Sequence, residues 1–191
     1  LANVGLIPLL LPGINFVPRE DGRYHPVCQC FRGEVCENIG KHPLQSWRKL
    51  GFDTPEIGLS ALKDYANKAN QKTFTFNLGI RTGGVSGVLG LDIDKKGDGT
   101  DGTPNFVAFL KDKKINDPIF YQTLTAQTGG GGLHYIYRYP KNGDVITNAA
   151  PHPAFNYGLN PKNPEESAVD IRGEGGILVT WPSIHKSRAD W

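Results

Sequence analysis

Frequent glycines and prolines divide the sequence into short apolar segments, and this division constrains the fold more than any other feature. The 191 residues include 24 Gly and 14 Pro, and both residue types are unfavourable inside helices. Only two segments, Pro55 to about Asn70 and Pro104 to about Lys113, carry the apolar spacing of a helix. Thr54 and Thr103 stand where helix N-caps are expected. The chain is therefore predicted to be an α+β protein in which two helices interrupt a series of strands.

The remaining apolar segments have the length and the turn boundaries of β-strands. Glycine clusters at 83–87, 129–132 and 173–176 supply turns between consecutive segments. The strands on either side of these turns are expected to form antiparallel hairpins, and residues 1–50 are otherwise rich in loops. The expected strands are Val4–Leu11, Phe74–Arg81, Val88–Asp94, Gln122–Thr128, Leu133–Tyr139, Ala168–Arg172 and Ile177–Trp181.

Composition and charge limit the classes of protein to which the chain can belong. A net charge of +2 and a pI near 8.4 permit nucleic-acid binding without requiring it. The apolar run Val4–Leu11 is interrupted by Pro8 and is too short to span a bilayer, and no signal peptide is recognisable. A cytoplasmic protein without membrane contact is expected. The start at Leu1 and the absence of methionine predict that the chain is cut from a longer protein.

The segment Val88–Asp94 reads VLGLDID and places Asp92 and Asp94 two residues apart on one strand. Side chains at positions i and i+2 of a strand point to the same face, so both carboxylates are expected to project together. Two adjacent negative charges are unfavourable unless a cation lies between them, and carboxylate oxygens suit Mg²⁺ or Mn²⁺. The pair indicates a site that holds divalent metals against a triphosphate, although two solvated aspartates at a strand end would give the same pattern.

Later segments offer further polar residues at or near strands. His134 follows the turn 129–132 and could donate to a phosphate, or could simply be packed or exposed. Asp170 and Arg172 share one face of a strand. Asp170 could complete a three-carboxylate metal site and Arg172 could balance an anionic substrate, with a surface salt bridge as the alternative. Three more candidate phosphate donors follow the last strand, namely Ser183, His185 and Lys186.

The three cysteines lie close together, between positions 28 and 36. An odd number in one short stretch argues against a disulfide framework and for a reducing compartment. With a nearby histidine they match a Cys₃His structural zinc site, and three reduced cysteines in a loop are the alternative. The expected zinc ligands are Cys28, Cys30, Cys36 and His42, with His25 as the alternative fourth ligand.

Five segments carry most of this chemistry, namely Asn77–Gly83, Ser86–Asp94, Thr128–His134, Val169–Gly176 and Pro182–His185. In this order they resemble the bifunctional DNA primase–polymerase (prim-pol) N-terminal domain of the archaeo-eukaryotic primase superfamily, over essentially the whole chain. Gly40–Pro43 and Trp47 also fit the family pattern. Two positions depart from it, because Trp181 stands where a proline is often found and Gly132 stands where a serine is often found.

The resemblance implies a single domain over residues 1–191 and a set of roles. The catalytic core, about 76–191, would be an RRM-like antiparallel or mixed sheet. A smaller N-terminal α/β lobe, about 1–75, would carry the zinc-stapled loop. Asp92, Asp94 and Asp170 would hold two divalent metals, and His134 would contact the triphosphate. The residues expected near the nucleotide are Arg81, Thr82, Arg172, Ser183, His185 and Lys186.

The implied activity is template-dependent nucleotidyl transfer, by which a DNA primase and DNA polymerase joins NTP or dNTP to a primer on single-stranded DNA. Because relatives are often fused to helicases on plasmids or phages, a fused or associated helicase of a mobile element is an expected partner. A metal-dependent nuclease or phosphohydrolase and a non-catalytic nucleic-acid-binding module are the alternatives. RNA-binding sheets usually stack bases on exposed aromatic side chains, whereas the presumed central strand here carries Asp92 and Asp94.

Overall fold

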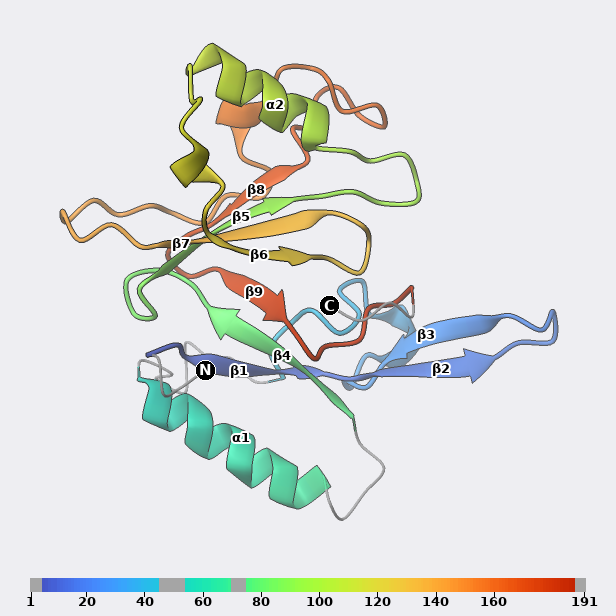
Figure 1. Ribbon diagram of the computed structural model, residues 1–191. Helices are drawn as coiled ribbons and strands as arrows, with labels where there is room; N and C mark the ends of the chain where they lie inside the picture. The colour runs from blue at the N-terminus through green and yellow to red at the C-terminus, as the bar shows by residue number, and fades with distance from the viewer. Residues whose placement is uncertain (1–4, 45–53, 70–74, 188–191) are drawn as a thin grey trace. The chain divides into compact units, whose positions relative to one another are not determined.

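The computed structural model describes residues 5–44, 54–69 and 75–187. Five residues named in the predictions from sequence lie outside these ranges, namely Leu1, Val4, Trp47, Asn70 and Phe74. The described chain is mixed α+β with antiparallel sheets (Figure 1), which confirms the expected class. It divides into two units, one formed by Leu1–Arg81 with Ile177–Trp191 and the other by Thr82–Gly176. Within the described residues, no helix has the length and apolar character needed to cross a membrane.

The first unit is built on a three-stranded antiparallel sheet with the order β1-β4-β9. Its strands are β1 (Pro8–Pro12), β4 (Phe76–Arg81) and β9 (Ile177–Thr180). Helix α1 (Pro55–Ala69) packs on this sheet, where Ala61 contacts the buried Ile7 and Leu9. The backbone N–H of Ile57 donates to Thr54 Oγ1 at 3.4 Å, so Thr54 caps α1 as predicted.

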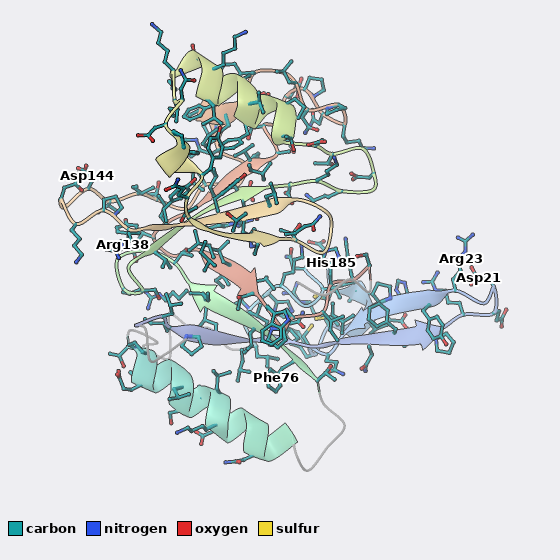
Figure 2. All side chains as sticks on the ribbon, viewed as in Figure 1. Asp21, Arg23, Phe76, Arg138, Asp144 and His185 are labelled. Atoms are coloured by element: carbon teal, nitrogen blue, oxygen red, sulfur yellow. The ribbon has the colours of Figure 1, made fainter. Side chains whose placement is uncertain are left out.

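A second, two-stranded sheet of this unit occupies the region in which only loops were expected. Strand β2 (Ile14–Pro18) pairs with β3 (Tyr24–Cys28). The backbone N–H of Arg23 donates to Asp21 Oδ1 at 2.9 Å in the turn between them (Figure 2). This hairpin was not predicted from the sequence because each strand contains a proline, which is tolerated at sheet edges but weakens the strand pattern. Strand β3 ends at Cys28 and therefore leads directly into the cysteine cluster.

The second unit contains a four-stranded antiparallel sheet with the order β6-β7-β5-β8. Its strands are β5 (Val88–Ile93), β6 (Leu124–Gln127), β7 (Leu133–Arg138) and β8 (Val169–Arg172). Helix α2 (Thr103–Asp112) packs Phe106 and Leu110 against Leu91 and Ile93 of the central strand. The N-cap of α2 is Gly102 rather than the predicted Thr103, which is the first residue of the helix.

Two of the expected hairpins are not formed. Strand β8 pairs with β5, whereas β9 pairs with β4 in the other unit, so the glycine segment 173–176 joins two sheets. Strands β4 and β5 are likewise in different sheets, although Gly83 and Val88 form an isolated bridge. The predicted β6–β7 hairpin is confirmed. A glycine cluster predicts that the chain bends, but it does not specify the strand that pairs on the far side.

The division into units also differs from the boundary expected near residue 75. Strands β4 and β9 pair with each other and with β1, so both belong to the first unit. The acidic strand β5 and its partners belong to the second. The predicted catalytic core, about 76–191, therefore contains strands from both units.

Candidate metal and nucleotide site

Three polar side chains lie side by side on adjacent strands of the second unit. The register places Asp92 of β5 opposite His134 of β7 on one side and opposite Asp170 of β8 on the other. Directly opposite residues of antiparallel strands point to the same face. The three residues are 9%, 4% and 6% exposed, respectively. Strand pairing therefore brings together three residues that are far apart in the sequence.

Arg172 joins the two carboxylates of this row. Its Nη2 atom lies 3.2 Å from Asp92 Oδ2 and 2.5 Å from Asp170 Oδ2. On the other side of Asp92, the Oδ1 atom lies 3.2 Å from His134 Nε2. The buried Nε of Arg172 has no hydrogen-bond partner among the described residues. The guanidinium thus supplies positive charge between two buried acids. The salt bridge that was the alternative for Asp170 and Arg172 is formed, but it is partly buried rather than at the surface.

The two acids that face each other differ in their proton affinity. Burial raises the pKa of Asp170 to about 6, with Arg172 opposing this rise and the Asp92 and Asp94 carboxylates adding to it. Burial also acts to raise the pKa of Asp92. The hydrogen bond from His134 and the charges of His134 and Arg172 outweigh burial, so the pKa of Asp92 is lowered. The raised pKa of Asp170 is caused mainly by burial, with the neighbouring carboxylates adding to it, and a cation bound beside Asp170 would oppose both effects.

Asp94 lies one residue beyond the end of β5 and is half-buried. Its backbone N–H donates to Ala168 O at 3.0 Å, so the chain stays aligned with the residue preceding β8. The Asp94 carboxylate is 2.9 Å from Lys96 Nζ, whereas Asp92 and Asp170 share Arg172. The structure therefore places Asp92 and Asp170 in one row, and Asp94 lies two residues after Asp92 and is paired with Lys96.

The aromatic residues of this sheet lie on the opposite face. Tyr135 follows His134 in β7, so its side chain points to the face opposite that of His134. The Tyr135 ring contacts Phe106, with 6.0 Å between ring centroids. Tyr137 donates from its hydroxyl to Phe120 O at 3.0 Å. No Phe, Tyr or Trp of the described strands β5–β8 points to the face that carries Asp92. This face therefore lacks the stacking platform of an RNA-binding sheet.

Gly132, which departs from the family pattern, is required by close packing. A Cβ atom at this position would lie 2.2 Å from Ile93 O, which is far inside van der Waals contact. The residue accordingly allows the turn before β7 to approach the end of β5. A serine at this position in this backbone would clash, so the structure accounts for the missing hydroxyl.

The other predicted nucleotide contacts are divided between the two units. Arg81, Ser183, His185 and Lys186 belong to the first unit, and Thr82 begins the second. The Thr82 hydroxyl is buried and donates to Gly173 O at 2.7 Å. This bond connects the two ends of the second unit, so the Thr82 hydroxyl has a structural role there.

Ser183 and His185 follow strand β9 (Figure 2 labels His185). Ser183 is 1% exposed, and its hydroxyl donates to Leu78 O at 3.0 Å and accepts from the Leu78 N–H at 2.8 Å. It therefore extends the pairing with β4, which favours a positioning role over direct contact with a phosphate. His185 is buried and its Nδ1 accepts from the Ser187 N–H at 3.3 Å. Lys186 is exposed, and so is Trp181, the first residue after β9.

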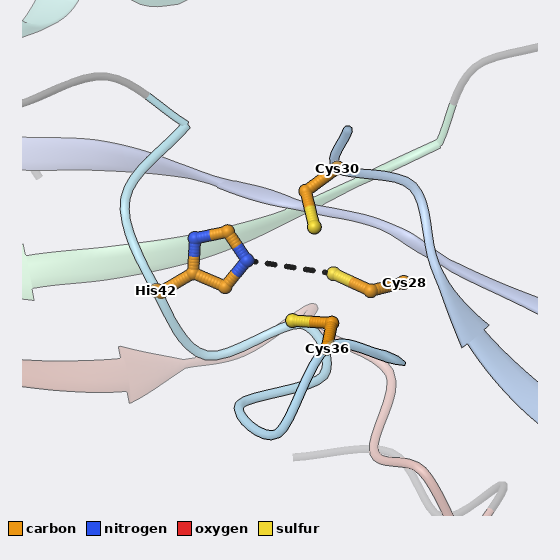
Figure 3. Close-up of side chains that lie close together, drawn as sticks. All are labelled: Cys28, Cys30, Cys36 and His42. Carbon is orange, nitrogen blue, oxygen red and sulfur yellow. Dashed lines mark hydrogen bonds between the residues drawn. The ribbon is translucent and has the colours of Figure 1, made fainter. Parts of the chain in front are cut away.

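The Cys₃His group of the first unit is assembled as the spacing suggested (Figure 3). The ligand atoms of Cys28, Cys30, Cys36 and His42 all lie within 4.8 Å of one another. Nε2 of His42 is 3.5 Å from Cys28 Sγ, and its Nδ1 is 3.1 Å from Pro43 O. A carbonyl that accepts from one ring nitrogen fixes the other as a metal ligand. The alternative ligand, His25, is not a member of the group.

The thiols of this group respond differently to their surroundings. Burial opposes ionisation of Cys30, but bonds from the backbone of Arg32 and from Cys28, His42 and Cys36 lower its pKa to about 6. Burial and the neighbouring thiols raise the pKa of Cys36 to about 11. The Cys30 thiolate is therefore favoured in the group, whereas ionisation of Cys36 needs a compensating cation. This donor set is compatible with a structural zinc ion.

One buried polar residue of the first unit was not recognised in the sequence. Asn77 interrupts the apolar strand β4 and hydrogen-bonds to the backbone at Gly40 and Ile184. A single asparagine between apolar strand residues was the available signal, since a buried amide needs partners.

Fold and site together define an α+β protein with paired buried acids, a histidine and an arginine on one sheet, and a Cys₃His group in another part of the chain. The sequence model of the family described as bifunctional DNA primase/polymerase, N-terminal, matches residues 4–191. The chain belongs to this family, which confirms the resemblance. At the family level, membership implies nucleotidyl transfer with DNA and nucleotides as substrates. Searches of curated proteins and of solved structures gave no match.

Proposed function

We propose that this chain catalyses template-dependent nucleotidyl transfer as a DNA primase and DNA polymerase. The observation that carries the proposal is the buried row of Asp92, His134 and Asp170 on adjacent strands, joined by Arg172. Family membership supplies the reaction class. The row supplies the place at which a cluster of negative charge could hold divalent cations.

In the proposed reaction the 3′-hydroxyl oxygen of the primer forms a bond to the α-phosphorus of an NTP or dNTP. The bond from this phosphorus to the oxygen bridging to the β-phosphorus breaks, and pyrophosphate leaves. Asp92, Asp94 and Asp170 would hold Mg²⁺ or Mn²⁺, which when bound neutralise triphosphate charge and lower the pKa of the attacking hydroxyl. Arg172 and His134 hold the Asp92 carboxylate in position, and pre-set geometry contributes to catalysis.

The proposal gives His134 a second part, contact with the triphosphate, which the family resemblance implies. Arg81, Thr82, Arg172, Ser183, His185 and Lys186 remain proposed nucleotide-site residues on the same ground. A single-stranded template, a primer and a fused or associated helicase on a mobile element are the proposed partners. Zn²⁺ is the proposed ion of the Cys₃His group.

We also propose that the second unit has an RRM-like core. Its strand order β6-β7-β5-β8, with α2 between β5 and β6, supports this proposal. The four-stranded ferredoxin-like arrangement has its first and third strands at the centre, as β5 and β7 are here. The usual second helix is represented by the 3₁₀ segment η4 (Pro153–Phe155) between β7 and β8.

The test is a primer-extension assay with labelled nucleotides and Mn²⁺ or Mg²⁺. The double variant Asp92→Ala with Asp94→Ala is expected to lose extension by about a hundredfold or more, because it removes two proposed cation ligands. Asp144→Ala is the matched control, since Asp144 is an exposed loop aspartate outside the site (Figure 2). Equal extension by the double variant and the parent would refute the metal-site assignment.

The same assay separates the two alternative functions. A nuclease or phosphohydrolase would shorten the primer without incorporating labelled nucleotide. A polymerase would lengthen the primer and release pyrophosphate. A non-catalytic binding module would do neither. The location of the aromatic residues on the helix-covered face of the sheet argues against base stacking as the purpose of this sheet.

A further inference from the structure

In the first unit, one buried side chain connects the Cys₃His loop to the segment that follows β9. The Asn77 amide of β4 donates from Nδ2 to Gly40 O at 3.1 Å and to Ile184 O at 2.9 Å. Its Oδ1 accepts from the Ile184 N–H at 2.9 Å. Both amide hydrogens are therefore used, and Asn77 is 2% exposed. The paired bonds to Ile184 reproduce the hydrogen-bonding pattern of a strand neighbour.

On one side of Asn77, the connection begins at the proposed zinc ligands. Gly40 lies between Cys36 and His42 in the sequence, so a metal held by both residues would fix the two ends of the segment that contains Gly40. Gly40 has φ +70, and a Cβ atom there would lie 2.7 Å from Asn77 Nδ2. Glycine is required at this point for the backbone conformation and for the close approach.

On the other side, the connection ends beside His185. Ser183 bonds through its hydroxyl to both backbone groups of Leu78, and Ile184 bonds to Asn77. Two consecutive residues after β9 are therefore held by β4 through side chains. The next residue, His185, is itself buried. Ile184, the residue before His185, is bonded to Asn77, and Asn77 is also bonded to Gly40 of the Cys₃His loop.

We propose that a zinc ion in the Cys₃His group sets the position of residues 183–185 through Gly40 and Asn77. Asn77 is on this account a positioning residue for His185, and the zinc ion does more than close its own loop. The inference rests on the proposed zinc ion and on the proposed nucleotide role of His185. Its central measurement, however, is made without nucleotide or DNA.

The first measurement establishes the metal. Protein purified without added zinc is expected to contain about one zinc per chain, and Co²⁺ exchange should give thiolate-to-cobalt absorption. His42→Ala is expected to weaken zinc binding at least tenfold in competition with a chelator, because even residues that only hydrogen-bond to a metal ligand change the metal affinity about 10- to 100-fold. His25→Ala is the control and should keep its zinc, because His25 is outside the group. Full zinc in the His42 variant would overturn the ligand assignment.

The second measurement tests the connection by amide hydrogen exchange in the parent protein with and without zinc. Removal of zinc is expected to increase exchange of the Ile184 amide by about tenfold or more, the effect of losing a buried hydrogen bond. The Arg81 amide is the internal reference, since it donates to Ile7 O at 3.0 Å in the same unit. Unchanged Ile184 exchange would overturn the connection. An equal increase at Arg81 would also overturn it, because zinc would then stabilise the whole unit.

A substitution then isolates Asn77 while zinc stays bound. Asn77→Asp keeps the shape and the acceptor but removes both donated bonds, so faster Ile184 exchange with unchanged zinc content is expected. Asn105→Asp is the control, because Asn105 is an equally buried asparagine that holds Tyr157 and Leu159 in the other unit. If Asn77→Asp does not fold, the zinc-removal experiment decides by itself. If the proposed activity exists, the KM for nucleotide should rise with little change in kcat.

Discussion

At the scale of single residues, Asp92 and Asp170 show how neighbours separate two carboxyl groups that face each other on adjacent strands. Asp92 contacts both His134 and Arg172, whereas Asp170 contacts Arg172. Burial acts on both acids, but only Asp170 keeps a raised pKa. Asp170 is therefore the acid whose charge state a bound cation would change most.

This difference predicts a pH dependence of stability in protein without added Mg²⁺ or Mn²⁺. Because the pKa of Asp170 is about 6 in the folded chain and lower when unfolded, the native state retains a proton that the unfolded state releases. The contribution of Asp170 to the free energy of unfolding therefore falls as pH rises from about 4 to about 6. Asp170→Asn removes this effect and should become more stable than the parent by up to about 3 kcal/mol at pH 7. Urea unfolding across this pH range measures the difference.

The amide is a suitable replacement because its oxygen still accepts from Arg172. A stability difference that stays constant between pH 4.5 and 7.5 would contradict the assignment of the raised pKa to Asp170. Addition of Mn²⁺ should stabilise the parent more than the variant, since a ligand that binds the native state raises its stability.

The sequence predicted individual acids and thiols better than the contacts they make. The spacing of Cys28, Cys30 and Cys36 limited the partners that each could have, and the structure brings them together. Ser183 was expected to meet phosphate, yet its hydroxyl is bonded to the Leu78 backbone. Asn77 was not recognised, because its partners Gly40 and Ile184 are far from it in the sequence. A polar residue type is visible in a sequence, whereas its partner depends on strand pairing.

At the scale of elements, helix α2 holds the sheet that carries the acidic row. Its buried Phe106 contacts Phe120, Tyr135 and Phe155 with ring centroids 6.0–6.4 Å apart. Phe106→Ala is expected to lower the free energy of unfolding by about 3–5 kcal/mol, because the truncation leaves a cavity in the core. The neighbouring Val107 is exposed, and Val107→Ala should change the free energy of unfolding by less than about 0.5 kcal/mol. Equal effects in thermal or urea unfolding would contradict this packing.

The elements themselves were recognisable where local pattern and pairing agree. The β6–β7 hairpin was predicted correctly because its strands are joined by one glycine turn and pair with each other. The same reasoning failed for β8 and β9, whose partners are β5 and β4. Glycine turns are local, whereas the partner of a strand after such a turn is decided by the whole sheet.

At the scale of the whole molecule, the second unit is continuous in sequence. It contains the buried core of Leu91, Ile93 and Phe106. Its two ends are joined, because the Thr82 N–H donates to Gly176 O at 2.9 Å. A fragment of residues 82–176 is therefore expected to fold alone and to unfold cooperatively in a circular-dichroism melt.

The Cys₃His ligands belong to the first unit, so a zinc chelator should leave the Tm of this fragment unchanged. Phe106→Ala within the fragment is the control and should lower that Tm or abolish the transition. A fragment without a cooperative transition would show that the second unit depends on the rest of the chain.

The first unit is, by contrast, interrupted in sequence, and this has a consequence for its synthesis. Strand β4 leaves the ribosome before the whole of Thr82–Gly176, and its neighbour β9 leaves after it. Until then one edge of β4 has unpaired backbone groups, which is the condition under which strands associate with the wrong partner. Ser183 and Ile184, which form hydrogen bonds with β4, are synthesised later still. A nascent chain that stalls before Ile177 would therefore contain a complete acidic row and also an unfinished, association-prone sheet.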